Sequence, residues 1–387
     1  MKKSLIAAAL AAALAPAAFA QTSVTMYGIA DAGVSLDNNG VDSYGLRVNS
    51  GYMSSSRFGV TGTEDIGGGL KGVFQLELGY GLDTGEFRQS ALFGSPSAAN
   101  PNGQSTSAGF NRRAFVGLQG GFGTVALGRD YTPMYWAGQA TDNLGFGLYG
   151  NNLNQQWLNG TFNAAGTNFT GNTTENYHRF NNALFYTSPK FGGLTVRAAL
   201  AAGQERFAEP RRAGRAASVG VDYGAGPLTV AAAFQMVALP VIGGPATAPV
   251  FTGDHRWRRD ALIGAKYNFG LFSLGGGYVQ VDPAGEENRN RQAWVGGTIR
   301  LGAGNLLTQV SRLEFERPAG GDEARTNVFA LAYTYPFSRR TTGYVSWGRA
   351  NNKNGARTAL HASDNNVPAG AINADPRGLA MGVRHAF

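Results

Sequence analysis

Short segments of this chain alternate apolar and polar residues with a period of two, and this pattern restricts the fold more than any other feature. In the segment LKGVFQLELGY (70–80), one parity is apolar: Leu70, Phe74, Leu76, Leu78 and Tyr80. The other parity carries Lys71, Gln75 and Glu77. Because successive side chains of a strand point to opposite faces, this segment is predicted to be a strand with one apolar and one polar face. A glutamate in the middle of the strand implies that the polar face meets water.

The same alternation recurs along the chain. It is found in the segments 24–35, 194–200, 228–236 and 378–387. Glycine, which weakens helices, accounts for 57 of the 387 residues. The stretch after the N-terminus that comes closest to a long apolar run, the uncharged segment 228–253, is interrupted by Pro240 and Pro245, so it is not a membrane-spanning helix. If such a chain crosses a membrane, it does so as a closed barrel.

The N-terminal segment MKKSLIAAALAAALAPAAFA has the features of a secretory signal peptide. Two lysines precede a short apolar run, and the tripeptide AFA forms a cleavage pattern. We therefore expect a signal peptide over 1–20 and one exported domain over 21–387. An N-terminal helix packed in a soluble core is the alternative, and it leaves the cleavage pattern unexplained.

Basic residues outnumber acidic residues, 33 to 25, but they are scattered along the chain. A nucleic-acid-binding protein gathers such residues on one face, so we expect no nucleic-acid partner. The surplus favours attraction for anionic solutes or lipid headgroups. The chain has no cysteine, so no disulfide stabilises it outside the cytoplasm.

Short glycine-rich turns alternate with long polar connections, and together they imply sixteen antiparallel strands. The short turns lie at 66–69, 120–123, 190–193, 224–226, 268–270, 302–304 and 336–340. The long connections lie near 37–43, 84–108, 131–180, 205–215, 240–256, 284–290, 318–325 and 353–376. This alternation is typical of bacterial outer-membrane barrels and argues against the rival architecture, a soluble β-sandwich. The segment 305–316 slips phase midway, which indicates a bulge.

Several motifs resemble the trimeric general porins of Gram-negative outer membranes, in their anion-selective, non-enterobacterial branch. The motifs are SVTMYGIADAGVS, SSSRFGVTGTEDIGGGLKGVFQLE, NRRAFVGLQGGFGTVALGRDYTP, RFNNALFYTSPKFGGL and the terminal GVRHAF. The resemblance implies a sixteen-stranded homotrimeric barrel with a water-filled pore, in contact with outer-membrane lipid and lipopolysaccharide. It also implies that the third external loop, about 131–180, folds into the lumen. Phe387 would be the signal for the barrel-assembly machinery.

Four charged residues lie at similar distances from the short turns. With a rise of roughly 3.3 Å per residue and a tilt near 45°, Arg57, Glu77, Arg112 and Arg179 all sit about 19–26 Å above the turns. Adjacent residues of a strand point to opposite faces, so one of Arg112 and Arg113 must face inward; the family pattern selects Arg112. Each arginine has an alternative role as a rim charge or a structural ion-pair partner, and Glu77 is expected to hold a neighbouring arginine.

Asp142 completes the predicted pore constriction. It comes from the inward-folding loop and is expected to face the arginines. Three positive charges against two negative ones leave a cationic field, which predicts a preference for chloride, phosphate and small organic acids over potassium.

Catalysis has little support. None of the four histidines stands at metal-ligand spacing with another histidine or a carboxylate, and the glycine patterns do not open a helix, so no metal, cofactor or catalytic site is expected. The sequence therefore predicts a passive outer-membrane pore for small hydrophilic solutes and ions. A barrel with a closed lumen, acting as an adhesin or anchor, and an outer-membrane esterase are the alternatives. Small residues on the outward parity of the first strand, Gly28, Ala30 and Ala32, favour close packing of subunits in a homotrimer.

Overall fold

The fold is taken from a computed structural model. The structure describes residues 23–87, 109–152, 161–162, 169–170, 178–203, 215–243, 250–282, 289–317 and 321–387. The expected signal peptide, 1–20, lies outside these residues and stays a prediction. Within the described ranges, no helix is long and apolar enough to span a bilayer.

Sixteen antiparallel strands form a closed ring, which confirms the predicted barrel. The strands are β1 (Ser23–Asn38), β3 (Arg57–Gly67), β4 (Leu70–Gly79), β5 (Arg113–Gly120), β6 (Gly123–Tyr131), β9 (Arg179–Thr187), β10 (Leu194–Ala202), β11 (Arg215–Ala225), β12 (Leu228–Gly243), β13 (Val250–Asn268), β14 (Phe272–Asp282), β15 (Asn290–Leu301), β16 (Gly304–Phe315), β17 (Ala324–Pro336), β18 (Thr341–Lys353) and β21 (Arg377–Ala386). Each pairs with the next in this order, and β21 returns to β1 from Ile29↔Ala386 to Asn38↔Arg377. The sheet therefore closes on itself and has no free edge, as a membrane barrel requires.

The remaining elements belong to the connections. β2 (Gly45–Ser50) pairs with β1 and makes the sheet seventeen-stranded in total. The pairs β7 (Thr161–Phe162) with β8 (Phe169–Thr170), and β19 (Leu360–His361) with β20 (Asn366–Val367), are two separate small sheets. The helix α2 (Pro133–Thr141) follows β6 directly.

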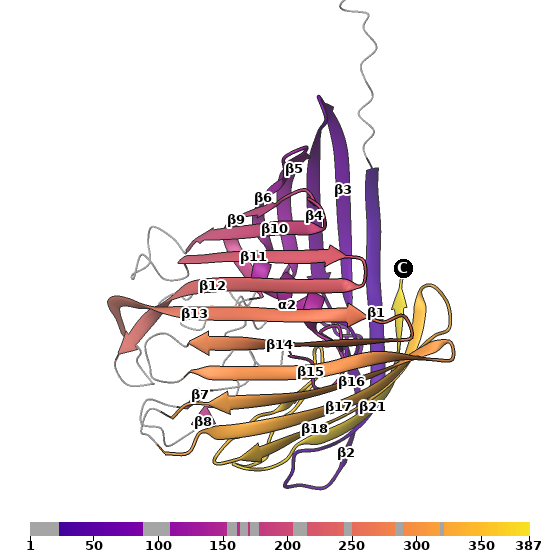
Figure 1. Cartoon of the computed structure of the whole chain (residues 1–387), viewed down its shortest axis with the longest axis vertical. Helices are drawn as coiled ribbons and strands as arrows, with labels where there is room; N and C mark the ends of the chain where they lie inside the picture. Colours follow the sequence, from indigo (N-terminus) through magenta and orange to yellow (C-terminus); the bar gives the residue numbers. More distant parts are fainter. Residues whose placement is uncertain are drawn as a thin grey trace, which may run out of the picture.

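The wall of the barrel is visible in Figure 1, where β11 to β15 run side by side across the middle of the view. The strands β1 and β3 run in a different direction, as expected for strands tilted around a closed barrel. The chain end closes onto the first strand, because the backbone of Phe387 exchanges hydrogen bonds of 3.0 and 3.1 Å with that of Gly28.

One face of each strand carries exposed apolar side chains, and the opposite face is packed. In β15, Val295 is 62% exposed, whereas its neighbour Trp294 is 5% exposed. In β13, Ile263 is exposed and Leu262 is buried. The exposed apolar parity forms the outer surface of the barrel, so the packed parity faces its interior.

The helix α2 lies on this interior face, against β11 to β13 and β14. Thr132 caps its N-terminus, accepting a 3.2 Å hydrogen bond from the backbone N–H of Tyr135, and Pro133 occupies the first turn, where proline is tolerated. Met134 and Ala137 are buried against Leu262 and its neighbours. The absence of a side chain at Gly264 leaves room for Thr141, since a Cβ there would lie 2.7 Å from the Thr141 Cβ.

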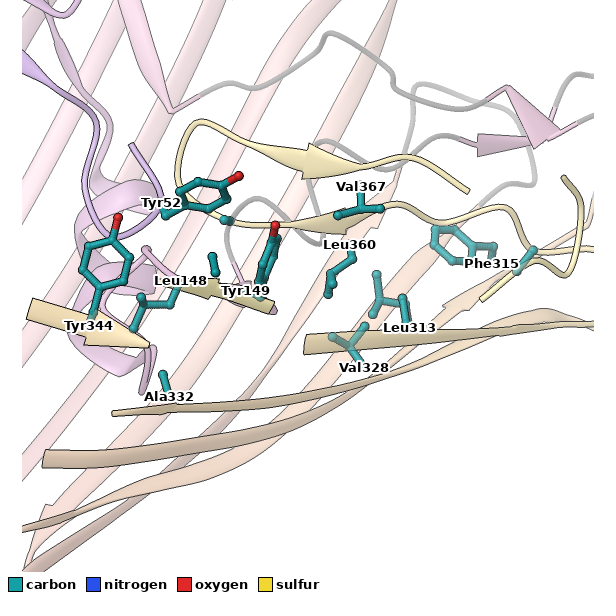
Figure 2. Close-up of a cluster of buried hydrophobic side chains, with 14 of the residues drawn as sticks. Tyr52, Leu148, Tyr149, Leu313, Phe315, Val328, Ala332, Tyr344, Leu360 and Val367 are labelled. Carbon is teal, nitrogen blue, oxygen red and sulfur yellow. The ribbon is translucent and has the colours of Figure 1, made fainter. Parts of the chain in front are cut away.

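A second cluster of buried side chains lies inside the barrel, against β16 to β18 and β21. Its buried residues include Tyr52, Leu148, Tyr149, Leu313, Phe315, Val328, Ala332, Tyr344, Leu360 and Val367. Figure 2 shows Leu148 and Tyr149 between the wall strands and the segment that carries Leu360 and Val367. Leu148 and Tyr149 of the connection after β6 therefore pack against Leu360 and Val367 of the connection after β18, and against the wall, in one apolar cluster inside the barrel.

Candidate functional site

A chain of hydrogen bonds spans the wall from β1 to β9, passing over β3. It begins at Tyr27 in β1, whose hydroxyl donates to Glu77 Oε2 over 2.8 Å. Glu77 Oε1 accepts from Arg112 Nε over 2.7 Å. The Tyr131 hydroxyl then accepts from Arg112 Nη2 and from Arg179 Nη2, each over 2.6 Å. We call Tyr27, Glu77, Arg112, Tyr131 and Arg179 the arginine chain.

Glu77 is the acidic member of the arginine chain, and it is only 4% exposed. A buried carboxylate is stable only where opposite charges and donors surround it. Arg112 and Tyr27 supply these, and Arg57 interacts with it electrostatically. The expectation that Glu77 holds a neighbouring arginine matches these contacts.

Arg112 and Arg113 both reach this region, although neighbouring residues of a strand point to opposite faces. Arg113 is the first residue of β5 and forms a two-bond ion pair with Asp130, with distances of 2.6 and 2.8 Å. Arg112 precedes the strand, so the alternation does not apply to it, and its side chain turns to Glu77. The sequence predicted that one of Arg112 and Arg113 faces inward. In the structure, both side chains lie in this region, each paired with a different carboxylate.

Arg57 and Arg129 are the other two arginines near the chain. Arg57 begins β3 beside Gly79 of β4, and it interacts electrostatically with Tyr131. Arg129 donates from Nε to the Asn111 carbonyl over 2.8 Å and also hydrogen-bonds to the side chain of Asn181. The central set is five arginines and two carboxylates: Arg57, Arg112, Arg113, Arg129 and Arg179, with Glu77 and Asp130. Asp364 and Arg384 interact electrostatically with Arg112 and Arg57, and their own charges cancel. Positive charge therefore exceeds negative charge there by three.

Aromatic rings connect this set to α2. The Tyr131 ring stacks on Tyr135, with centroids 3.9 Å apart, and the guanidinium carbon of Arg179 lies 4.2 Å from the Tyr131 centroid. Trp136 packs edge-on against Tyr131 and lies near the guanidinium groups of Arg113 and Arg197. The helix and the arginines thus share one aromatic contact surface.

Asp142 does not lie where the sequence placed it. Its carboxylate accepts hydrogen bonds from Phe146 N (2.7 Å), Asn152 N (3.2 Å) and Gln309 Nε2 (3.0 Å). None of its hydrogen-bond partners among the described residues is an arginine, so the expectation that it faces the arginines is corrected. Burial raises the pKa of Asp142, and these hydrogen bonds oppose the rise.

The reason for this placement is the backbone after α2. Phe146 and Leu148 have φ values of 60° and 61°, a left-handed conformation that costs side-chain-bearing residues of order 1–3 kcal/mol each. Asp142 ends the helix and satisfies the N–H groups that this sharp path leaves without helical partners. Lys266 Nζ adds a 2.9 Å hydrogen bond to the Asp142 carbonyl, from the wall.

Tyr149 fixes the end of this segment to the first strand. Its hydroxyl donates to Asp37 Oδ1 over 2.7 Å, and its backbone N–H donates to Ser346 Oγ over 3.0 Å. Asp37 also pairs with Arg47 of β2, whose Nε lies 2.9 Å from Oδ2. The ring of Tyr149 packs edge-on against Tyr52, as seen in Figure 2. The segment from Asp142 to Tyr149 is thus hydrogen-bonded to the barrel wall at both ends.

Sequence reasoning missed Tyr131, Asp130 and Arg129. A signal for Asp130 existed, because it and Arg113 are equally distant from the turn at 120–123 and so must face each other in a hairpin. The same count places Tyr131 opposite Arg112, each eight residues from that turn, but the bulge between Gly128 and Asp130 shifts the register of β6 with β9, so the count does not predict the contact with Arg179.

No group of three or more potential metal ligands occurs within the part of the chain that the structure describes. His178 and His361 are buried, and burial lowers the pKa of both. Phe387 lies at the seam, with its ring over Gly28. The basic residues Arg211 and Arg212 lie outside the described residues.

Comparison with known proteins agrees with this architecture. Residues 7–355 match the Gram-negative porin family. The chain is 33% identical over 411 residues to outer membrane porin protein 32 of Delftia acidovorans, with full coverage of both chains. Its fold resembles that of an anion-selective porin from Comamonas acidovorans, with a TM-score of 0.75, 26% identity and coverage of 95% and 100% of the two chains. A trimer form of OmpT from Vibrio cholerae shares the fold, with a TM-score of 0.61, 16% identity and coverage of 95% and 99%. A barrel of sixteen strands and a family match over most of its length show that this chain belongs to the Gram-negative porins of the outer membrane.

Proposed function

We propose that this outer membrane porin prefers anions, and that chloride, phosphate and small organic acids pass through it by passive diffusion. The observation that carries the proposal is the excess of three positive charges among Arg57, Arg112, Arg113, Arg129 and Arg179 and their two carboxylates. Low-dielectric walls focus such a field and raise the local concentration of anions. Rings of arginine or lysine are a common device of anion-selective pores.

The constriction in this proposal is formed by two facing parts. One is the wall around the arginine chain, with Arg57, Arg112, Arg179 and Glu77 as the residues whose charges act on passing solutes. The other is the third external loop, 131–180, whose helix α2 packs inside the barrel. Asp142 has a different role, because its carboxylate holds the loop together.

The proposed assembly is a homotrimer in contact with outer-membrane lipid and lipopolysaccharide. Ala30 and Ala32 lie on the outward parity of β1, half-buried, between the exposed Met26 and Val34. Small residues at such a surface permit close packing of subunits. Phe387 would act as the recognition signal for the assembly machinery. A native mass of one chain in mild detergent, with the barrel still folded, would contradict the trimer.

Planar-bilayer recording tests the channel and its selectivity together. We expect conductance, and a reversal potential in a salt gradient that indicates a preference for chloride over potassium, strongest in dilute salt because the Debye length is about 10 Å at 0.1 M. Folded protein without conductance would favour a barrel with a closed lumen, such as an adhesin. Conductance without anion preference would contradict only the selectivity.

Replacement of the arginines identifies the source of the field. Arg57→Ala, Arg112→Ala and Arg179→Ala together remove three charges, but Arg112 is the ion-pair partner of the buried Glu77. Glu77→Gln must therefore accompany them, since an unpaired buried carboxylate is strongly destabilising. We expect this fourfold variant to lose most of the preference while retaining a folded barrel. An unchanged reversal potential would assign selectivity to residues elsewhere, such as Arg211 and Arg212.

A further inference from the structure

We propose that Tyr131 is a specificity-determining residue, whose hydroxyl oxygen positions Arg112 and Arg179 side by side at the constriction. The inference rests on the proposed anion preference and extends it to a residue that bears no charge. Tyr131 would act through the two arginines, as a positioning residue.

The contacts are unusual because two cations converge on one neutral oxygen. Arg112 Nη2 and Arg179 Nη2 each lie 2.6 Å from the Tyr131 hydroxyl, and Tyr131 is only 5% exposed. Guanidinium groups have no acceptor atoms, so they cannot hydrogen-bond to each other, and the Tyr131 oxygen is an acceptor that both share. Like charges also repel, and Arg112 is held by Glu77 as well, so loss of the shared acceptor would let Arg179 move away from Arg112.

The neutrality of this acceptor matters for selectivity. A carboxylate at the same place would hold the arginines equally well, but its charge would cancel one of them. Arg113 illustrates that case, because it is paired with Asp130 through two hydrogen bonds. The phenol oxygen instead holds two guanidinium groups and leaves the net charge of the site unchanged.

The position of Tyr131 is itself firmly set. Its ring stacks on Tyr135 of α2 and packs edge-on against Trp136, and it stands at the end of β6 beside the register shift at Gly128. A bulge of this kind re-aims side chains next to functional sites. The hydroxyl is therefore a fixed point to which the longer, more flexible arginines are attached.

The test is the reversal potential of Tyr131→Phe, which removes one oxygen and retains the ring. We expect the ratio of chloride to potassium permeability to fall by about twofold or more, because the two charges move apart. The matched control is Tyr344→Phe, since Tyr344 is also a buried tyrosine, 4% exposed, whose hydroxyl contacts a charged group, Asp31, over 2.7 Å. The control is expected to lower stability and to leave the ratio unchanged.

A double-mutant comparison distinguishes positioning from a general loosening of the fold. If Tyr131 acts through the arginines, Tyr131→Phe has no further effect on the ratio once Arg112→Gln and Arg179→Gln are present, together with Glu77→Gln so that no buried carboxylate is left unpaired. If Tyr131→Phe does not fold, Arg179→Lys serves instead, because it keeps the charge and loses the planar donor geometry. A retained ratio in Arg179→Lys, or in Tyr131→Phe, would overturn the inference while leaving the proposed function intact. A wild-type channel without anion preference would overturn both.

Discussion

Replacement of Glu77 by glutamine is expected to change selectivity and stability in opposite directions. The wild-type carboxylate is 4% exposed and pairs with Arg112 at 2.7 Å. Glu77→Gln removes one negative charge and leaves the shape of the side chain nearly the same. Arg112 then lies in a largely buried position without its ionic partner.

The stability cost follows from the burial of the pair. The Arg112 and Glu77 side chains are 11% and 5% exposed, so solvent screens their attraction little. Breaking a buried pair by removing one partner costs about 3–5 kcal/mol, and the glutamine oxygen can still accept one hydrogen bond, so we expect about 3 kcal/mol. Urea unfolding of the detergent-solubilised protein measures this change.

The selectivity gain follows from the distance between the charge and a permeating ion. A unit charge acting through about 8 Å of water contributes about 0.5 kcal/mol, or about a twofold change in local ion concentration. Loss of the negative charge should therefore raise the chloride preference about twofold in dilute salt. The increase should shrink as salt rises.

The matched control is Asp130→Asn, which removes the partner of Arg113 in the same region. Like Glu77→Gln, it is expected to raise the chloride preference and to lower the free energy of unfolding. A fall in chloride preference for Glu77→Gln would refute the reasoning, because it would mean that Glu77 serves selectivity by orienting Arg112 and not by opposing its charge.

Three further outcomes are expected elsewhere in the molecule. Burial lowers the pKa of His361 to about 3, so the folded chain binds fewer protons than the unfolded chain between about pH 3 and 6.5. The free energy of unfolding should therefore fall by up to about 1.4 kcal/mol per pH unit as pH drops through this range. The loss of unfolding free energy between pH 7 and pH 5 should be smaller in His361→Gln than in the wild type, and an equal loss would contradict this. Tyr149→Phe loses the 2.7 Å bond to Asp37 and should cost about 1–2 kcal/mol, whereas Tyr186→Phe, at an exposed hydroxyl, should change the unfolding free energy little. Gly28→Ala would place a Cβ 2.2 Å from the Phe387 ring, so it should slow the appearance of the heat-modifiable folded band on a gel. Gly72→Ala, which has open space around its Cβ position, should fold at the wild-type rate. Equal rates for the two variants would count against a role for the terminal ring.

The barrel could be predicted from the sequence because its rules are local. Alternation with a period of two and glycine-rich turns determine which residues pair, and the turns at 66–69 and 120–123 indeed join β3 to β4 and β5 to β6. The prediction of a bulge within 305–316 was wrong. That segment pairs with β15 and β17 in continuous register, so its loss of alternation reflects a change in which face is polar.

The site was less predictable because its contacts do not follow the strand period. Arg112 precedes its strand, and Tyr131 follows a register shift against β9, so strand parity does not predict which face either side chain meets. Asp142 was placed by its charge and by its position in the inward-folding loop, whereas the left-handed backbone at Phe146 and Leu148 decides where its carboxylate lies. Tertiary geometry of this kind depends on several distant segments at once.

The apolar cluster inside the barrel constrains the order in which the molecule can assemble. Tyr52, Leu148, Leu313 and Leu360 come from four distant parts of the chain, and the wall beneath them includes the seam of β1 with β21. Contacts of such long sequence separation form late, because the entropy of closing each loop must be offset first. The ring should therefore close around an open, wide lumen, and the interior segments should settle into it afterwards. A newly inserted barrel would then conduct more, and discriminate less, than the mature channel.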